Sequence, residues 1–340
     1  MLASAGLGVF GLAAGVAAGA VLHLVVQLPA LARCGATYNL TLDVGHPGVR
    51  EILGLLLPRA IGLTAAQVNF VVYTALASGL ASGSIASLNY AWLLTMMPLG
   101  IFGIAVANAV FPTLAEQVAE HDLASLRRTV HGALRMVLFL TIPASVGLIM
   151  LRVPLIAALF QRGSFDQQST QMTAWALLFF ALGLFAHATL EVVTRAFYAL
   201  HDTRTPVALA VVSMLLNVGL SLVLVRSLQH GGLALSMSIA TVIEAGCLLI
   251  ILAWRLPHLV DWRLATATAK AVAAAGVMGG VIGVLGSQVT IEQTSDTTRL
   301  VAIAAAATLG GFVYLGVALV LKSEEINAAS RALANLLKKI

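Results

Sequence analysis

The chain has 340 residues, of which 60% are hydrophobic and 10% are charged, and its mean hydropathy is +0.98. Soluble domains carry about a quarter charged residues, so this composition excludes an ordinary soluble protein. The net charge of +5 does not indicate nucleic-acid binding, because no basic cluster is interleaved with aromatic side chains. Repeated apolar runs of about 18 or more residues predict an all-α polytopic membrane protein.

Nine apolar segments are long enough to cross a bilayer as helices. They are residues 3–28, 55–79, 84–111, 132–152, 171–198, 206–226, 232–254, 266–287 and 299–321. The first lacks a basic start and runs too long for a cleaved signal peptide, so we expect a retained span. Pro98 lies inside the third, where it removes a backbone hydrogen bond and predicts a kink that suits a cavity wall.

Basic residues are unequally divided between the two sides that these spans define. All but four of the 19 Lys and Arg residues fall on one side, the exceptions being Arg152, Arg162, Arg226 and Arg299. Because such an excess marks the cytoplasmic side, we expect the N-terminus outside and the C-terminus in the cytoplasm.

Two segments on the predicted cytoplasmic side have amphipathic patterns. Glu116 to Arg135 and the tail from Glu324 both mix apolar residues with charged ones. We expect both to form helices that lie on the anionic inner leaflet. For the tail, an ordinary solvated helix end explains the pattern equally well.

Ionisable side chains inside the predicted spans are functional markers, because each costs about 2.5–3.5 kcal/mol unless it is paired or hydrated. Glu191 and Arg195 are spaced i,i+4, so they can pair on one helix face, for function or to lock the helix orientation. Arg59 lies at a span entrance, where it can bind a ligand or extend to the headgroups. Glu244 lies in mid-span without a partner within one turn, so we expect it to face protein or water and to be protonated.

A second group of candidates is polar but neutral. Its members are Gln67, Asn69, Asn89, Asn108, Asn217, Ser221 and Thr241. Such side chains join helices more often than they contact ligands. Asn217 and Ser221, at i,i+4, could offer oxygens to a cation, although no acid adjoins them. The sequence has no glycine-rich phosphate loop, Ser/His/Asp arrangement, HExxH or CxxC motif, so we expect no enzyme, cofactor or metal site.

Several ordered motifs between Pro58 and Pro206 point to one family. They are Pro58-Arg59-Ala60-Ile61-Gly62, 80–86, 98–105, 111–114, 159–166 and, most clearly, Arg195-Ala-Phe-Tyr-Ala-Leu-His-Asp-Thr-Arg-Thr-Pro206. On these motifs the chain resembles the MurJ (MviN) lipid II flippases of the multidrug/oligosaccharidyl-lipid/polysaccharide (MOP) exporter superfamily.

The resemblance implies a domain organisation. Family members have two six-helix lobes followed by two more helices, and this chain corresponds to a C-terminal portion without the first five spans. Residues 1–54 would hold the family's sixth span and a linker, and 55–254 the second six-helix lobe. Residues 255–322 would form the final pair, with a groove for the lipid tail, and 323–340 a cytoplasmic amphipathic tail.

The resemblance also implies a function in the bacterial cytoplasmic membrane. Such proteins flip lipid II, an undecaprenyl-pyrophosphate-linked peptidoglycan precursor, by alternating access, and so serve cell-wall biogenesis and cell shape. The side chains that would contact this lipid are Arg59, Arg195, Glu191, Asn89, Gln67 and Asn69. Those with an ionic or structural role would be Glu244, Asn217, Ser221 and Thr241. Membrane lipids and cell-wall synthesis proteins are the further partners we expect.

One departure from the family keeps alternatives open. Many members carry Asp, Arg and Glu where this chain has Trp92, Leu93 and Met96. A related exporter of polysaccharide-linked lipids or drugs, or a truncated homologue that does not transport, would also fit. An enzyme of lipid-linked glycan synthesis lacks the acidic metal-binding loop it would need. The sequence does not choose between an ion gradient and the membrane potential as the driving force.

Overall fold

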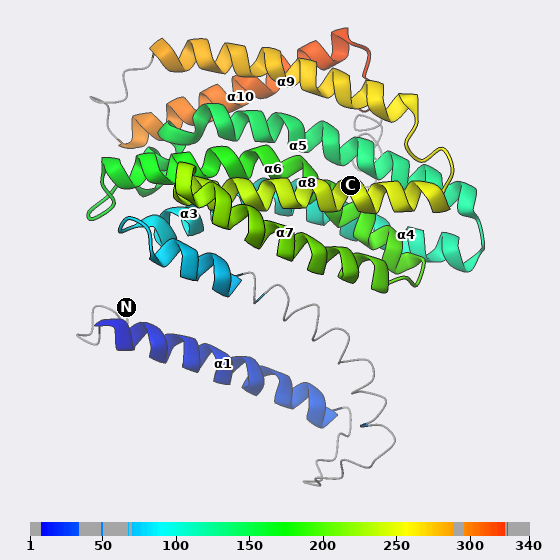
Figure 1. The fold of residues 1–340 in the computed structure, drawn as a ribbon, viewed down its shortest axis with the longest axis horizontal. Coiled ribbons are helices and arrows are strands. Elements are labelled where there is room, and N and C mark those ends of the chain that lie inside the picture. The colour runs from blue at the N-terminus through cyan, green and yellow to red at the C-terminus, as the bar shows by residue number, and fades with distance from the viewer. Residues whose placement is uncertain are drawn as a thin grey trace. The chain divides into compact units, whose positions relative to one another are not determined.

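The computed structural model describes residues 8–33, 70–288 and 296–323, with the single residues 49, 67 and 325. Every regular element in these ranges is helical, as the apolar runs predicted (Figure 1). Eight helical segments are long and apolar enough to cross a membrane, and each coincides with a predicted span. The remaining predicted span, 55–79, lies largely outside the described residues. The part of it that is described is helical at residue 67 and from 70 to 78.

The chain divides into two compact units, Met1–Pro58 and Arg59–Ile340. The first contains α1 (Gly8–Arg33), an apolar helix whose large side chains, such as Phe10 and Val26, are exposed. A helix that is apolar all round needs lipid or protein around it. Its length and composition therefore suit a membrane span.

The second unit is a bundle of helices that run up and down in succession. In chain order they are α3 (Ser84–Pro98), η2 (Leu99–Ile104), α4 (Ala105–Ala119), α5 (Leu123–Phe160), α6 (Gln167–Ala199), α7 (Arg204–Leu228), α8 (His230–Arg255), α9 (Trp262–Gln288) and α10 (Asp296–Val320). The α4–α5, α6–α7 and α8–α9 turns lie at one end (Figure 1). We call it the basic end, because it carries Arg127, Arg128, Arg204, Arg255 and Arg263.

Aspartates define the start of four of these helices. Asp122, Asp166, Asp202 and Asp261 each accept a hydrogen bond from the backbone N–H three residues later, at 2.8–3.0 Å. This contact satisfies an N–H group that a helix start otherwise leaves unpaired. Hydrogen bonds to the carboxylate favour its charged form, so the pKa values of Asp122, Asp166 and Asp261 lie below the usual range.

α6 is the central helix, and α3, α4, α5 and α8 pack around it. In its most apolar stretch 67% of residues are buried, against 17% in α7. Phe180 and Phe197 are among its completely buried side chains. Gly183 lets α8 approach closely, since a Cβ there would lie 2.5 Å from Oγ of Ser238. Residues borne by α6 are therefore held by several neighbours, whereas α7 turns much of its surface outward.

An irregular segment interrupts the span that begins with α3. The six residues of η2 form a π-helix directly after Pro98, which has no N–H to donate to the helical ladder. The sequence predicted a kink at Pro98, and the structure has a π-helical segment there. Gly103 in this segment packs on α6, where an added Cβ would lie 3.1 Å from Cα of Ala188. Because π-turns in α-helices often occur at functional sites, this segment marks a place where the span can bend.

The interfacial helix predicted for Glu116 to Arg135 is wrong. α4 continues to Ala119, and α5 begins at Leu123 and runs unbroken to Phe160. Leu126 and Val130 are completely buried in a cluster with residues of α6 and α8, so protein covers the apolar face. The spacing of the apolar residues predicted correctly which helix face is apolar. The residues of α6 and α8 that this face contacts lie far away in the sequence. The predicted tail helix lies outside the described residues, apart from Glu325.

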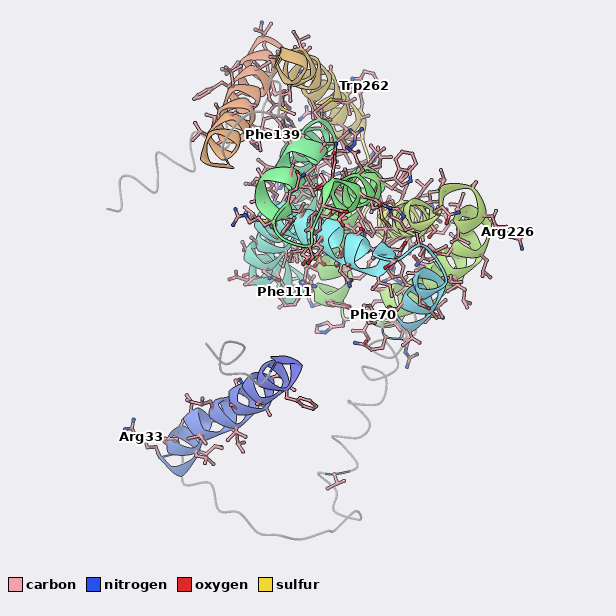
Figure 2. All side chains as sticks on the ribbon, turned by 90° about the vertical axis from the view of Figure 1, so that its left-hand side faces the viewer. Arg33, Phe70, Phe111, Phe139, Arg226 and Trp262 are labelled. Atoms are coloured by element: carbon pink, nitrogen blue, oxygen red, sulfur yellow. The ribbon has the colours of Figure 1, made fainter. Side chains whose placement is uncertain are left out.

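The last two helices pack on α5 as a separate layer (Figure 1). Phe139 and Ile142 of α5 form a cluster with α9 alanines and with Tyr314 of α10. The Tyr314 hydroxyl donates a 2.7 Å hydrogen bond to the carbonyl of Phe139. Figure 2 labels Phe139 where α5 meets this pair. α9 and α10 are thus fixed to α5 by a polar contact as well as by apolar packing.

Candidate functional site

Glu191 and Arg195 of α6 form the ion pair that their spacing predicted. Nη2 of Arg195 lies 3.5 Å from Oε2 of Glu191. The guanidinium also donates two hydrogen bonds to Oδ1 of Asn108 on α4, 3.1 Å from Nη2 and 3.3 Å from Nε. The Arg195 and Glu191 side chains remain 25% and 31% exposed. We call these three residues the Arg195 cluster.

The Arg195 cluster lies close to the basic end of the bundle. Arg195 is four residues before the end of α6, roughly 6 Å at 1.5 Å per residue. Its Nη1 takes part in neither contact above, and arginine carries five N–H donors. Arginine binds carboxylates and phosphates through two donors at once. The cluster can therefore bind an anion that enters from this end.

The other predicted ligand residues do not join this cluster in the described part of the chain. Asn89 is exposed on α3, 19 residues before Asn108, which corresponds to roughly 28 Å along a helix. Gln67 is helical and exposed. Arg59 and Asn69 lie outside the described residues, so their roles stay predictions.

Three residues of α3 differ from the family pattern that the motifs indicated, and they offer apolar side chains in the structure too. Trp92 points inward, and its ring centroid lies 5.3 Å from those of both Phe180 and His187. Leu93 is 55% exposed, and Met96 packs against the main core cluster. This part of the span therefore offers hydrophobic surface where the family carries charges.

A second polar group lies in the interface between α7 and α8. Oγ of Ser221 is 2.7 Å from Oγ of Ser236 and 3.5 Å from Oδ1 of Asn217. Glu244 lies in mid-span on α8, where it is half-buried. Ser213, Asn217 and Ser221 recur every four residues, so they form one stripe on α7. All three are buried. We call these three residues, together with Ser236, the α7–α8 seam.

Thr241 was predicted as a polar candidate beside Glu244, but it faces a different helix. Its hydroxyl lies 3.4 Å from Nε2 of His187 on α6. Thr241 is buried, and the His187 ring contacts Trp92 edge-on. This contact joins α3, α6 and α8 in the core, so Thr241 has a packing role there.

Ion pairs at the basic end hold the turns together. Arg255 at the end of α8 pairs with Asp202 of the α6–α7 turn at 2.6 Å, and its guanidinium carbon lies 5.3 Å from the Phe197 ring centroid. Burial alone raises the pKa of Asp202, but hydrogen bonds from Thr205 and the hydrogen bond and charge of Arg255 outweigh it and lower the pKa to about 2. Such mutually satisfied charges stabilise the turns and leave little capacity for a ligand.

Two further contacts at this end fasten the last helix pair to α5. His131 lies 3.0 Å from Asp261 in the α8–α9 turn. Arg135 lies 2.5 Å from Glu325, just beyond α10. The basic side chains of α5 therefore position α9 and α10, which the sequence did not reveal because these partners are more than a hundred residues away.

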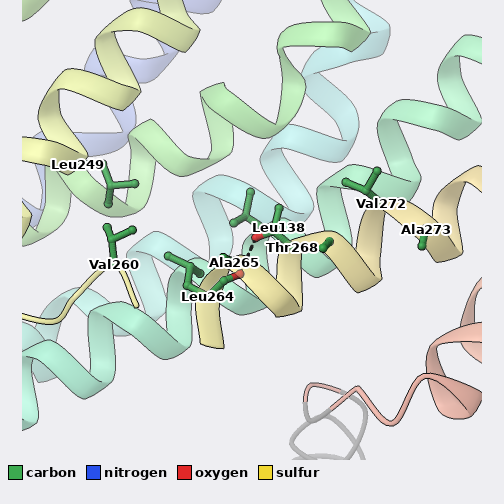
Figure 3. A pocket seen from close by; sticks show the side chains of 9 residues that line it. Leu138, Leu249, Val260, Leu264, Ala265, Thr268, Val272 and Ala273 are labelled. Carbon is green, nitrogen blue, oxygen red and sulfur yellow. Dashed lines mark hydrogen bonds between the residues drawn. The ribbon is translucent and has the colours of Figure 1, made fainter. Parts of the chain in front are cut away.

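An apolar groove of about 640 Å³ lies between α9 and helices α5 and α8 (Figure 3). It is lined by Leu138, Leu249, Val260, Leu264, Ala265, Thr268, Ala269, Val272 and Ala273. The Thr268 hydroxyl already donates to the carbonyl of Leu264, at 2.9 Å. The groove thus presents hydrocarbon, which suits an alkyl or prenyl chain. No group of three or more His, Cys, Asp or Glu that could hold a metal occurs in the described ranges.

Eight helical segments that are long and apolar enough to cross a membrane define a multi-pass membrane protein. Residues 1–305 match the family model described as lipid II flippase MurJ, and the chain belongs to this family. The resemblance that the motifs indicated is thereby confirmed.

Relatives and a solved structure agree with this assignment. The chain is 34% identical over 263 residues to a probable lipid II flippase MurJ of Rhizobium tropici, covering 77% of this chain and 49% of the relative. A probable lipid II flippase MurJ of Bdellovibrio bacteriovorus is 30% identical over 322 residues, 95% and 61% of the two chains. A lipid II flippase MurJ in an inward closed conformation shares the fold, with a TM-score of 0.78 and 24% identity over 95% of this chain and 64% of that one. The chain spans about half the length of the first of these relatives.

Proposed function

We propose that this chain takes part in flipping lipid II across the bacterial cytoplasmic membrane. Family membership supports the reaction, and the two sites described above suit the two halves of such a lipid. The pyrophosphate-linked headgroup is anionic, whereas its prenyl tail is pure hydrocarbon. The headgroup would cross through a hydrated cavity while the tail stays in lipid.

The Arg195 cluster is the observation that carries this proposal. Arg195 is a partly exposed arginine near the end of a membrane helix, held by Glu191 and Asn108 with a donor nitrogen left over. A pyrophosphate that arrives there would compete with Glu191 for the guanidinium. Such an exchange gives the protein different affinities before and after the headgroup moves, which alternating access requires.

The charge distribution supports an orientation. Among the described residues of the second unit, the basic end carries most of the Lys and Arg side chains, whereas Arg162 and Arg226 lie at the opposite end. By the positive-inside rule the basic end would face the cytoplasm, with the C-terminus on the same side. The Arg195 cluster would then meet lipid II on the side where it is synthesised.

The apolar groove on α9 supports a role for the final helix pair. Its lining side chains are nearly all aliphatic, and Val260 and Val272 are about half exposed. We assign residues 255–322 to holding the prenyl tail, in line with the family's architecture. Flipping makes and breaks no covalent bond, so the proposal assigns no catalytic residue and no cofactor.

Complementation tests the proposed function. The chain would be produced in cells depleted of their own lipid II flippase, alone and together with the N-terminal spans of a complete relative. Survival and arrival of lipid II at the outer leaflet would be followed. The proposal is supported if the wild-type chain rescues the cells in either arm and Arg195→Ala does not. It is contradicted if neither arm rescues the cells although the chain is verified in the membrane.

Arg226→Ala is the matched control. Arg226 is also an arginine near the end of a membrane helix, but it extends away from the bundle at the other end of α7 (Figure 2). Its replacement should leave rescue intact, so that loss of activity in Arg195→Ala reports on the site and not on arginine removal in general.

Export of a cationic drug is a second candidate, which Glu244 favours. Cationic substrates select for intramembrane acids that lack a basic partner, and Glu244 in mid-span of α8 forms no ion pair among the described residues. Resistance to lipophilic cations in cells that produce the chain, without rescue of flippase depletion, would favour this function over lipid II transport.

A further inference from the structure

Asn108 holds the Arg195 guanidinium along one edge. Its Oδ1 accepts hydrogen bonds from Nε at 3.3 Å and from Nη2 at 3.1 Å, so a single oxygen spans both nitrogens of that edge. Glu191 contacts the same Nη2, at 3.5 Å. A guanidinium is planar, and its N–H groups point in fixed directions. Contacts along the Nε–Nη2 edge therefore fix the direction in which Nη1 points.

The acceptor that Asn108 offers is a neutral one. A carboxamide oxygen accepts hydrogen bonds without carrying a charge, whereas a carboxylate would also neutralise the cation. The shortest contact of the Arg195 guanidinium within its cluster, at 3.1 Å, is thus made to an uncharged group. Within the described ranges, Glu191 is the one carboxylate paired with Arg195. Asn108 therefore orients the guanidinium and leaves its positive charge for an anion.

An irregular turn of the backbone sets the direction of Asn108. The residue lies on α4, four positions after η2 ends at Ile104. In η2 the N–H of Ala105 bonds to the carbonyl of Gly100, five residues back instead of four. One extra residue in a turn rotates everything beyond it by about 100° relative to an unbroken α-helix. An unbroken helix could therefore not keep both the buried face of α3 and Asn108 in their present directions.

Close packing of η2 on α6 brings the two spans near enough for a short side chain to reach across. Gly103 lies against Ala188, where an added Cβ would be 3.1 Å from the Cα atom, and both residues are buried. Asn108 follows Gly103 by five residues and Arg195 follows Ala188 by seven, roughly 8 and 11 Å along the two helices. The hydrogen bonds to Arg195 thus form about two turns beyond this close contact, toward the basic end.

We propose that Asn108 is a positioning residue for headgroup binding, which orients the Arg195 guanidinium toward a pyrophosphate without cancelling its charge. The inference rests on the proposed function and adds to it a residue that acts through Arg195. Ordering a long arginine side chain costs conformational entropy. A guanidinium that is already oriented spares the ligand that cost, which strengthens binding.

A double-mutant cycle tests this role. Calorimetry would measure the binding of farnesyl pyrophosphate, a short prenyl pyrophosphate, to the purified full chain in detergent. Asn108→Ala should weaken binding about fivefold, because the ligand must then order the guanidinium itself. In an Arg195→Lys background the same change should have less than about a twofold effect, since an ammonium group has no planar fork to orient. Equal weakening in both backgrounds would mean that Asn108 contacts the ligand or supports the fold, and would overturn the proposal.

Asn108→Asp separates orientation from charge. It keeps an oxygen acceptor but adds a negative charge, so binding should be weaker than in Asn108→Ala. Binding as tight as in wild type would overturn the proposal that the partner must be neutral. Gln168→Ala is the matched control, because it removes an exposed amide at the start of α6, at the other end of the bundle. It should bind farnesyl pyrophosphate as wild type does.

The same measurements separate this inference from the proposed function. If Arg195→Ala abolishes binding and Asn108→Ala leaves it unchanged, the headgroup site stands and only the positioning role is wrong. If Arg195→Ala binds as tightly as wild type, the proposed headgroup site is wrong and the positioning role with it. Asn108 is exposed, so its variants should unfold at about the wild-type temperature, which shows that a loss of binding does not come from unfolding.

Discussion

The Arg195 cluster on α6 and the middle of α8 each place a glutamate inside the predicted membrane spans, in different surroundings. Glu191 has an arginine one turn away, and the pair is partly exposed near one end of the bundle. Glu244 lies in mid-span on α8, and the described residues form no ion pair with it. A carboxylate beside a cation can stay charged, whereas an unpaired charge at this depth is costly. The comparison teaches that partner and depth, and not residue type, set the role of an intramembrane acid.

Replacing Arg195 has the largest expected effect, because it removes the cation from the charged site. Arg195→Ala should weaken lipid II binding by more than about tenfold, since hydrogen bonds to charged groups contribute about 1.5–3 kcal/mol. Binding to the purified chain in detergent measures this. Restoration of function in the double variant Arg195→Ala with Glu191→Ala would show that the pair is structural and has no ligand role.

Removing a hydroxyl from the α7–α8 seam should cost less. Ser221→Ala leaves Ser236 without its 2.7 Å partner and is expected to destabilise the fold by about 1 kcal/mol, the usual contribution of one hydrogen bond. Thermal unfolding followed by tryptophan fluorescence measures it. Ser227→Ala, in an exposed position at the end of α7, is the control and should leave the unfolding midpoint unchanged. Equal effects of the two changes would contradict a special role for the seam.

Neutralising the acid of the charged site should act in the reverse direction from removing its arginine. Glu191→Gln releases Arg195 from an ion pair that, at this exposure, contributes up to about 1 kcal/mol. Headgroup affinity should therefore rise, by at most about fivefold. Weaker binding in Glu191→Gln would mean that Glu191 orients the guanidinium for the ligand and does not compete with it.

An effect that depends on pH is expected at the basic end, where the charges satisfy one another outside the membrane. Arg255 and Thr205 lower the pKa of Asp202 to about 2, from 3.8 in an unfolded chain. A lowered pKa stabilises the fold above the unfolded value and ceases to do so as the pH falls through the folded value. Wild type should unfold a few degrees above Asp202→Asn at neutral pH, and the gap should close between about pH 4 and 2. A gap that is independent of pH would contradict this origin.

Local patterns in the sequence predicted much of the fold and one contact of the site. Apolar runs located the spans, since a membrane helix needs about 20 apolar residues whatever its neighbours are. The i,i+4 spacing predicted the pairing of Glu191 with Arg195 and the proximity of Asn217 to Ser221. Pro98 predicted a kink, and the structure has a π-helical segment directly after it.

Contacts between distant parts of the chain could not be predicted in this way. Asn108 and Thr241 were recognised as polar, but their partners Arg195 and His187 belong to other helices, 87 and 54 residues away. The segment from Glu116 to Arg135 was misplaced for the same reason, because an apolar helix face packs equally well on lipid or on protein. The spacing of residues in the sequence predicts which side chains share a helix face. Only the packed structure shows which residues that face contacts.

Binding of lipid II to wild type, Arg195→Ala and Glu191→Gln, compared by native mass spectrometry of the chain released from detergent, tests the central claim most directly. If the Arg195 cluster binds the pyrophosphate, wild type retains the lipid, Arg195→Ala loses it and Glu191→Gln holds it at least as well. Equal retention by wild type and Arg195→Ala would contradict the account and place the headgroup elsewhere in the protein.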